Sequence, residues 1–152
     1  MLRITLASLH LLALSLGMLA TVLRGSALRD APSVDALRRA LRMDAIWGIA
    51  AALWLVTGLW RLLGETEKPM GYYFENHWFL AKMGLFVLIF VLEIGPMMTV
   101  MRWRKALRAG ASPDSLVTPS AARRIALVGH LQATLALLMI FAAASMARGY
   151  GA

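Results

Sequence analysis

Four long apolar runs divide the chain, and each is about as long as a membrane-spanning helix. They cover residues 4–23, 45–63, 78–101 and 125–147. About 20 apolar residues, each rising about 1.5 Å, cross the roughly 30 Å hydrocarbon core of a bilayer. No run alternates between apolar and polar positions as a half-buried strand does, and backbone groups in lipid must be satisfied within helices or a closed barrel. The pattern predicts an all-α, four-transmembrane-helix bundle that forms a single integral membrane domain over residues 1–152.

The first run could also be a secretory signal peptide. The apolar region of such a peptide is about 7–15 residues long and follows a basic stretch. Residues 4–23 form a longer run, and the stronger basic cluster lies behind it. We therefore expect a first span.

Charged residues in the connections predict the orientation. The first and third connections are rich in arginine, whereas the middle one carries Glu65, Glu67 and Glu75. Short loops rich in Lys and Arg stay in the cytoplasm, so we expect both termini outside, in a multi-pass protein of a bacterial inner membrane. The basic residues of the two cytoplasmic connections are Arg24, Arg29, Arg38, Arg39, Arg42, Arg102, Arg104, Lys105, Arg108, Arg123 and Arg124.

A short segment before the second span has two interpretations. Pro32-Ser33 can open a helix with Ser33 as N-cap, and Leu37 and Leu41 then alternate with arginines such as Arg38. This segment is either a cytoplasmic interfacial helix, whose arginines contact anionic lipid headgroups, or a solvated extension of the second span.

Composition narrows the classes of function. The chain is 60% hydrophobic, with a formal charge of +8 and a mean hydropathy of +0.67. Because the basic residues flank the apolar runs, we interpret the positive charge as a signal that orients the protein in the membrane, and not as a nucleic-acid-binding surface. The chain has no cysteine, which excludes disulfides and thiolate chemistry.

Ionisable residues inside the spans are the candidate functional residues, because charges are costly in lipid. They are His10, Lys82, Glu93 and His130. We take Lys82, Glu93 and His130 as candidate catalytic or relay groups. Each also has a structural interpretation, in which it satisfies a neighbouring polar group or extends toward the interface.

His10 shares a helix face with Gly17 and Arg24, because the three are spaced seven residues apart. A histidine facing the bundle can ligate haem iron, and a glycine one heptad away would clear space for the macrocycle. The alternative is a histidine hydrogen-bonded to a neighbouring helix, with Gly17 allowing close packing.

Glu93 and Lys82 lie about 16 Å apart along the third span and cannot pair with each other. Lys82, one turn inside Trp78, either extends to the interface or pairs with an acidic ligand group such as a haem propionate. Glu93 precedes Gly95-Pro96 and lies at the depth of His130 and Gln132. We expect a Glu93–His130 hydrogen bond, serving either a proton relay or polar satisfaction.

The second span presents small residues at heptad spacing. Ala51 and Gly58 follow Asp44 on one helix face, which is typical of a helix-packing surface. At the end of the span, Asp44 could pair with Arg24 or Arg42.

The sequence resembles a family of bacterial predicted membrane proteins of unknown function. The resemblance covers most of the chain, through the segments LASLHLLALSLG, DAIWGIAAALWLVTGLWRL, HWFLAKMGLFVLIFVLEIGPM and MARGYG. More remotely, the chain is similar to HemJ-type protoporphyrinogen oxidases and to CopD-like copper-resistance membrane proteins.

The HemJ-like resemblance implies a haem b site. His10 matches the first-span histidine of that family, and Trp78 and Lys82 match its Trp-x-x-x-Lys motif. It implies that His10 ligates the iron and that Trp78 and Lys82 belong to the cofactor site, beside the space that we expect at Gly17. HemJ proteins carry a further histidine where this chain has Leu80, and an Asn-Glu-x-Pro segment that this chain lacks.

Three functions therefore remain open. The first is a haem b redox protein, which would be an electron carrier or an oxidoreductase that oxidises a small hydrophobic substrate. The second is a small transporter or ion-handling protein that uses Lys82, Glu93 and His130. The third is an accessory subunit packed in a larger membrane complex through Gly17, Ala51 and Gly58. A homodimer is compatible with all three.

Overall fold

The chain folds into helices in the computed structural model, which describes residues 1–30, 33–64 and 68–151. The long helices are α1 (Leu2–Ala27), α2 (Val34–Leu63), α4 (His77–Arg108) and α6 (Pro119–Ala147). The short elements are η1 (Leu28–Asp30), α3 (Met70–Glu75) and α5 (Pro113–Leu116). All four long helices are long and apolar enough to cross a membrane. The predicted all-α fold with four spans is confirmed, and the described ranges contain no strand.

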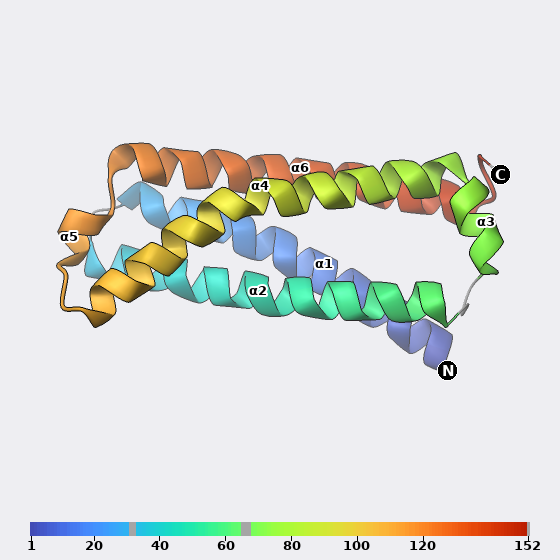
Figure 1. The fold of residues 1–152 in the computed structure, drawn as a ribbon, viewed down its shortest axis with the longest axis horizontal. Helices are drawn as coiled ribbons and strands as arrows, with labels where there is room; N and C mark the ends of the chain where they lie inside the picture. The colour runs from blue at the N-terminus through green and yellow to red at the C-terminus, as the bar shows by residue number, and fades with distance from the viewer. Residues whose placement is uncertain (31–32, 65–67, 152) are drawn as a thin grey trace.

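The long helices run lengthwise past one another, so successive connections lie at opposite ends of the bundle (Figure 1). Both termini lie at the end that carries α3, and α5 lies at the other end. This arrangement agrees with an even number of membrane crossings. Which end faces the cytoplasm stays a prediction from the arginine-rich connections.

Polar side chains cap the starts of α2, α4 and α6, the last through Thr118 Oγ1, which accepts from the Ala121 amide at 3.3 Å. Ser33 Oγ accepts a hydrogen bond from the Ala36 amide at 3.1 Å, as predicted, whereas Pro32 lies outside the described residues. Asn76 Oδ1 accepts from the amides of Trp78 and Phe79 at 3.0 and 3.2 Å. Each cap satisfies backbone N–H groups that lack a partner within the helix. Because α2 continues without a break from Val34, the segment after Ser33 extends the second span and is not a separate interfacial helix.

Lipid replaces water as the solvent for most of this surface. Large apolar side chains such as Leu12, Leu53 and Phe141 point outward and are at least half exposed. Inside, one apolar cluster around Trp47, Trp54 and other buried residues fills the middle of the bundle. A second cluster, which includes Leu37 and Trp103, lies toward α5.

Two glycines allow α1 and α6 to approach closely. A Cβ added to Gly129 would lie 2.6 Å from the Thr21 carbonyl oxygen. A Cβ added to Gly25 would lie 2.7 Å from the Ala126 Cα. Side chains at these positions would separate the helices, so small residues set this crossing.

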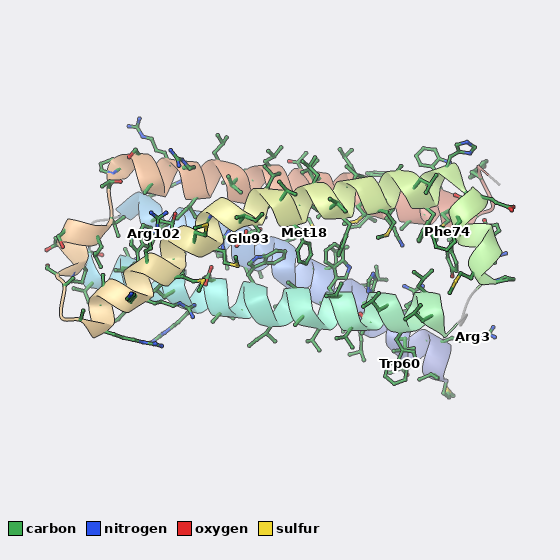
Figure 2. All side chains as sticks on the ribbon, viewed as in Figure 1. Arg3, Met18, Trp60, Phe74, Glu93 and Arg102 are labelled. Carbon is green, nitrogen blue, oxygen red and sulfur yellow. The ribbon has the colours of Figure 1, made fainter. Side chains whose placement is uncertain are left out.

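The helix α4 changes direction along its length (Figure 1). Its first half follows α6, and its second half crosses toward the start of α2. Glu93 lies close to this change of direction (Figure 2), and buried Pro96 lies within the helix. Proline removes one backbone hydrogen bond and bends a helix, so the bend explains how one helix contacts two neighbours.

Candidate functional site

Arg24 on α1 is the centre of a buried ion network. Its side chain is 0% exposed. Nη1 and Nη2 donate to the two carboxylate oxygens of Glu93 on α4, at 2.6 and 2.9 Å. Nη1 also donates to Asp44 Oδ1 on α2 at 2.9 Å. One guanidinium therefore binds two carboxylates, and it binds Glu93 in the bidentate geometry that makes such pairs strong.

Arg104 and Gln132 extend the network. Arg104, also on α4, donates from Nη2 to Asp44 Oδ2 at 2.9 Å and to the Leu41 carbonyl at 3.1 Å. Gln132 on α6 donates from Nε2 to Glu93 Oε2 at 2.9 Å and to the Ile89 carbonyl at 3.1 Å. Every spanning helix thus contributes a side chain. Two arginines face two carboxylates, so the charges balance.

Exposure is lowest in the middle of this network. The side chain of Arg104 is 39% exposed and that of Asp44 is 17% exposed. The Arg24 side chain is 0% exposed, and that of Glu93, beyond it, is 12% exposed. The network therefore leads from the surface near the α5 end of the bundle, through a fully buried guanidinium, to a largely buried carboxylate.

A small cavity lies beside the buried end of the network. Its volume is about 10 Å³, and its lining includes Gln132, Thr21 and Trp54. Gln132 is 2% exposed, and its Oε1 has no hydrogen-bond partner in the described part of the chain. Most other lining residues are apolar, such as Leu14, Met18 and Ile89, so the cavity offers few hydrogen-bond partners for a water.

His10 takes part in a separate hydrogen-bonded group nearer the termini. Trp54 Nε1 donates to His10 Nε2 at 3.0 Å, so this ring nitrogen accepts and the proton of the neutral imidazole lies on Nδ1. Nδ1 then donates to Thr57 Oγ1 at 2.9 Å, and Thr57 donates to the Leu53 carbonyl at 2.7 Å. Both ring nitrogens are engaged, as in the helix-packing interpretation.

The residues around His10 do not fit a haem in this arrangement. An iron ligand needs a free ring nitrogen, whereas Trp54 and Thr57 occupy both. The space beside Gly17 is also filled, because a Cβ there would lie 2.7 Å from Trp47 Cζ3. Across the same helix pair, a Cβ on Gly58 would lie 3.0 Å from His10 Cε1. Gly17 and Gly58 thus pack α1 against α2 and do not open a cofactor space.

Lys82 has no carboxylate partner in residues 1–30, 33–64 and 68–151. Its Nζ lies over the Phe79 ring, 5.2 Å from the centroid. Arg61 and Lys82 both lie within electrostatic range of His10. Lys82 and Arg61 therefore both contribute positive charge in the region of His10. Trp78, the other residue of the motif, is 40% exposed and lies beside Gly151.

The predicted Glu93–His130 hydrogen bond is wrong. His130 lies exposed on α6, and its Nδ1 is 2.8 Å from the carbonyl oxygen of Ala126 in its own helix. Gln132, two residues further, faces Glu93 instead. Residues two apart on a helix point to different sides, which explains why depth alone could not identify the partner.

The predicted pairing of Asp44 with Arg24 is confirmed, whereas two contributors to these sites were not predicted. Arg104 appeared to belong to a cytoplasmic loop, but α4 extends to Arg108 and carries it to Asp44. Trp54 on α2 donates to His10, and no sequence signal indicated this bond. Nowhere in the described residues do three or more His, Cys, Asp or Glu side chains gather as a metal site would require.

Residues 2–151 match the family described as "Predicted membrane protein (DUF2214)". No curated protein and no solved structure matches the chain. The remote resemblance to HemJ-type and CopD-like proteins therefore stays a prediction.

Proposed function

The chain belongs to this family of predicted membrane proteins, and we propose that it is a proton-handling membrane protein in which Glu93 exchanges the proton. The observation that carries the proposal is the Arg24 guanidinium shared between Glu93 and Asp44. Ionisable groups inside a membrane are costly and commonly mark ion and proton pathways.

The shared guanidinium gives the network two arrangements. With Glu93 ionised, Arg24 binds both carboxylates. With Glu93 protonated, Arg24 keeps its hydrogen bond to Asp44, a carboxylate that it shares with the more exposed Arg104. A proton can thus arrive at Glu93 without leaving a buried arginine unpaired, which is the most costly outcome in a low-dielectric interior. The α4 bend lies beside Glu93 (Figure 2) and provides a place where this change can alter helix packing.

Polar groups continue beyond Glu93 toward the other end of the bundle. Gln132 binds Glu93 and lines the cavity of about 10 Å³. Trp54 lines the same cavity and donates to His10. The cavity therefore lies between Gln132, the amide partner of Glu93, and the hydrogen-bonded group of Trp54 and His10. Lys82 lies beside this second group.

Proton flux in liposomes tests the proposal. Purified protein is reconstituted around a pH-sensitive dye, and a potassium diffusion potential drives protons across the bilayer. We expect flux in the wild type and its loss in Glu93→Gln, which keeps the side-chain shape and removes the titrating group. Asp35→Asn is the matched control, because the Asp35 side chain is 82% exposed; it should retain flux. Wild-type liposomes no more permeable than empty ones would contradict the proposal.

Haem binding is the alternative function, supported by the position of Lys82 near His10. It requires the His10 ring to leave Trp54 or Thr57. Oxidised and dithionite-reduced absorption spectra of protein from haem-replete cells distinguish the two functions. Our proposal expects no Soret band. A band present in the wild type and lost in His10→Ala would instead establish a haem protein, with electron transfer or oxidation of a small hydrophobic substrate as its role.

A further inference from the structure

A cleft of about 320 Å³ opens between α4 and α6 near the α5 end of the bundle. Its volume lies at the lower end of the range of small-ligand sites, about 300–1,000 Å³. Its lining is Pro96, Thr99, Arg102 and Trp103 from α4, and Ser120, Ala121, Arg124 and Ile125 from α6. The proposed proton function does not use this cleft.

The charge of the cleft has one sign. Arg102 and Arg124 line it, and the lining contains no carboxylate. Across the described ranges, neither arginine forms an ion pair. Arg102 uses its Nε to donate to the Met98 carbonyl at 3.3 Å, which leaves the terminal nitrogens of its guanidinium for a ligand. The first turn of α6 also reaches the cleft through Ser120 and Ala121, and the N-terminus of a helix favours an anion.

Apart from Thr99, the remaining lining is apolar: Trp103 and Ile125 lie at the level of the arginines, and Pro96 lies nearly two turns further toward the middle of α4. Pro96, Trp103 and Ile125 are buried, and the helices that carry them continue into the spanning region. A ligand that fits this gradient has an anionic head at the level of the arginines and a hydrocarbon portion along the helices. Basic pockets between spanning helices bind anionic lipid headgroups in this way.

We propose that the cleft binds the phosphate headgroup of an anionic phospholipid, with Arg102 and Arg124 as its ligands. A free phosphate ion shares the headgroup chemistry but does not use the apolar lining. The lipid therefore explains both parts of the cleft, and the free ion explains only one.

Native mass spectrometry of the detergent-purified protein tests this assignment. Phosphatidylglycerol and phosphatidylcholine with identical acyl chains are titrated separately. We expect tighter binding of phosphatidylglycerol, and a loss of about 25-fold in its affinity when Arg102→Gln and Arg124→Gln are combined, since each arginine near an anionic group contributes about fivefold. The combination of Arg108→Gln with Arg123→Gln removes the same charge from exposed positions outside the cleft and should retain the preference.

Three outcomes would overturn the proposal. The two double variants could lose affinity equally, which would indicate a general electrostatic effect. Phosphatidylcholine could bind as tightly as phosphatidylglycerol, which would indicate apolar contacts alone. Calorimetry could show binding of inorganic phosphate that the Arg102 and Arg124 variants lose while lipid binding is unchanged, which would indicate a free-anion site. Thermal unfolding of both double variants verifies that they are equally folded.

Discussion

Arg24 binds Glu93 through two parallel hydrogen bonds of 2.6 and 2.9 Å, and the two residues come from helices α1 and α4. The pair joins segments that are 69 positions apart in sequence. It also links α1 to α4 close to the bend of α4. On one side of the pair, Arg24 also binds Asp44. On the other side, Glu93 binds Gln132, which lines the small cavity.

Removing the arginine should cost more stability than removing the pair. Arg24→Met leaves the Glu93 carboxylate buried without its counter-ion, and we expect a loss of about 3–5 kcal/mol. Adding Glu93→Leu removes that charge and should restore part of the loss. Unfolding in detergent–SDS mixtures measures all three proteins. If Arg24→Met were as stable as the wild type, the network would not stabilise the fold.

The His10 ring should carry its proton on Nδ1. Trp54 donates to Nε2, so nitrogen-15 NMR of histidine-labelled protein should show one ring with an unprotonated Nε2. Trp54→Phe keeps most of the packing and removes the donor, and should cost about 1–3 kcal/mol as an unsatisfied buried acceptor. An Nε2-protonated ring in the wild type would contradict this hydrogen-bond arrangement.

Gly129→Ala should separate α1 from α6. The added Cβ would meet a backbone oxygen at 2.6 Å, and overpacking of this kind costs about 1–3 kcal/mol. Gly84→Ala is the matched control, because a Cβ there meets nothing within 4 Å; in a helix interior it should stabilise by up to about 1 kcal/mol. Thermal unfolding compares the two. The same effect from both substitutions would refute close packing at Gly129.

Asn76 should be more important for stability than an ordinary helix cap. It caps α4 and also donates from Nδ2 to the Tyr150 carbonyl at 3.0 Å, and it is 0% exposed. We expect Asn76→Ala to cost about 2 kcal/mol, at the upper end for caps. Ser33→Ala, which loses a single capping bond on an exposed residue, should cost about 0.5–1 kcal/mol. Hydrogen exchange at the C-terminal residues should rise in the Asn76 variant alone.

The sequence predicted the spans well because their signal is local. Apolar runs of sufficient length identify helices in lipid without reference to any partner. The ends were less predictable, since α4 continues through Arg104 to Arg108 and so carries a charged side chain back to Asp44. Capping by Asn76 shows the same limit. An Asn before an apolar run is a known N-cap signal, but its contact with Tyr150 depends on how the C-terminal residues fold back.

The candidate site was predictable only in part. The cost of charge in lipid singled out Glu93 and His10, and both are partly buried and hydrogen-bonded to neighbouring helices. The partner of Glu93 depended on which side of α6 faces α4. Gln132 lies on that side, and His130 does not. The bulky Trp47 fills the space that Gly17 leaves, and a single sequence cannot reveal such a complementary pair. Tertiary packing therefore decided what local spacing left open.

The decisive measurement is whether Glu93 binds a proton. Infrared difference spectra recorded through an acid titration of the membrane-reconstituted protein report when a buried carboxylate becomes a carboxylic acid. We predict a carbonyl-stretch band of a carboxylic acid in the wild type and in Asp35→Asn, and its absence in Glu93→Gln. If the wild type and Glu93→Gln give the same spectra throughout the pH range in which the fold persists, Glu93 stays ionised beside Arg24. The network would then hold the helices together without exchanging a proton, which contradicts the proposed function.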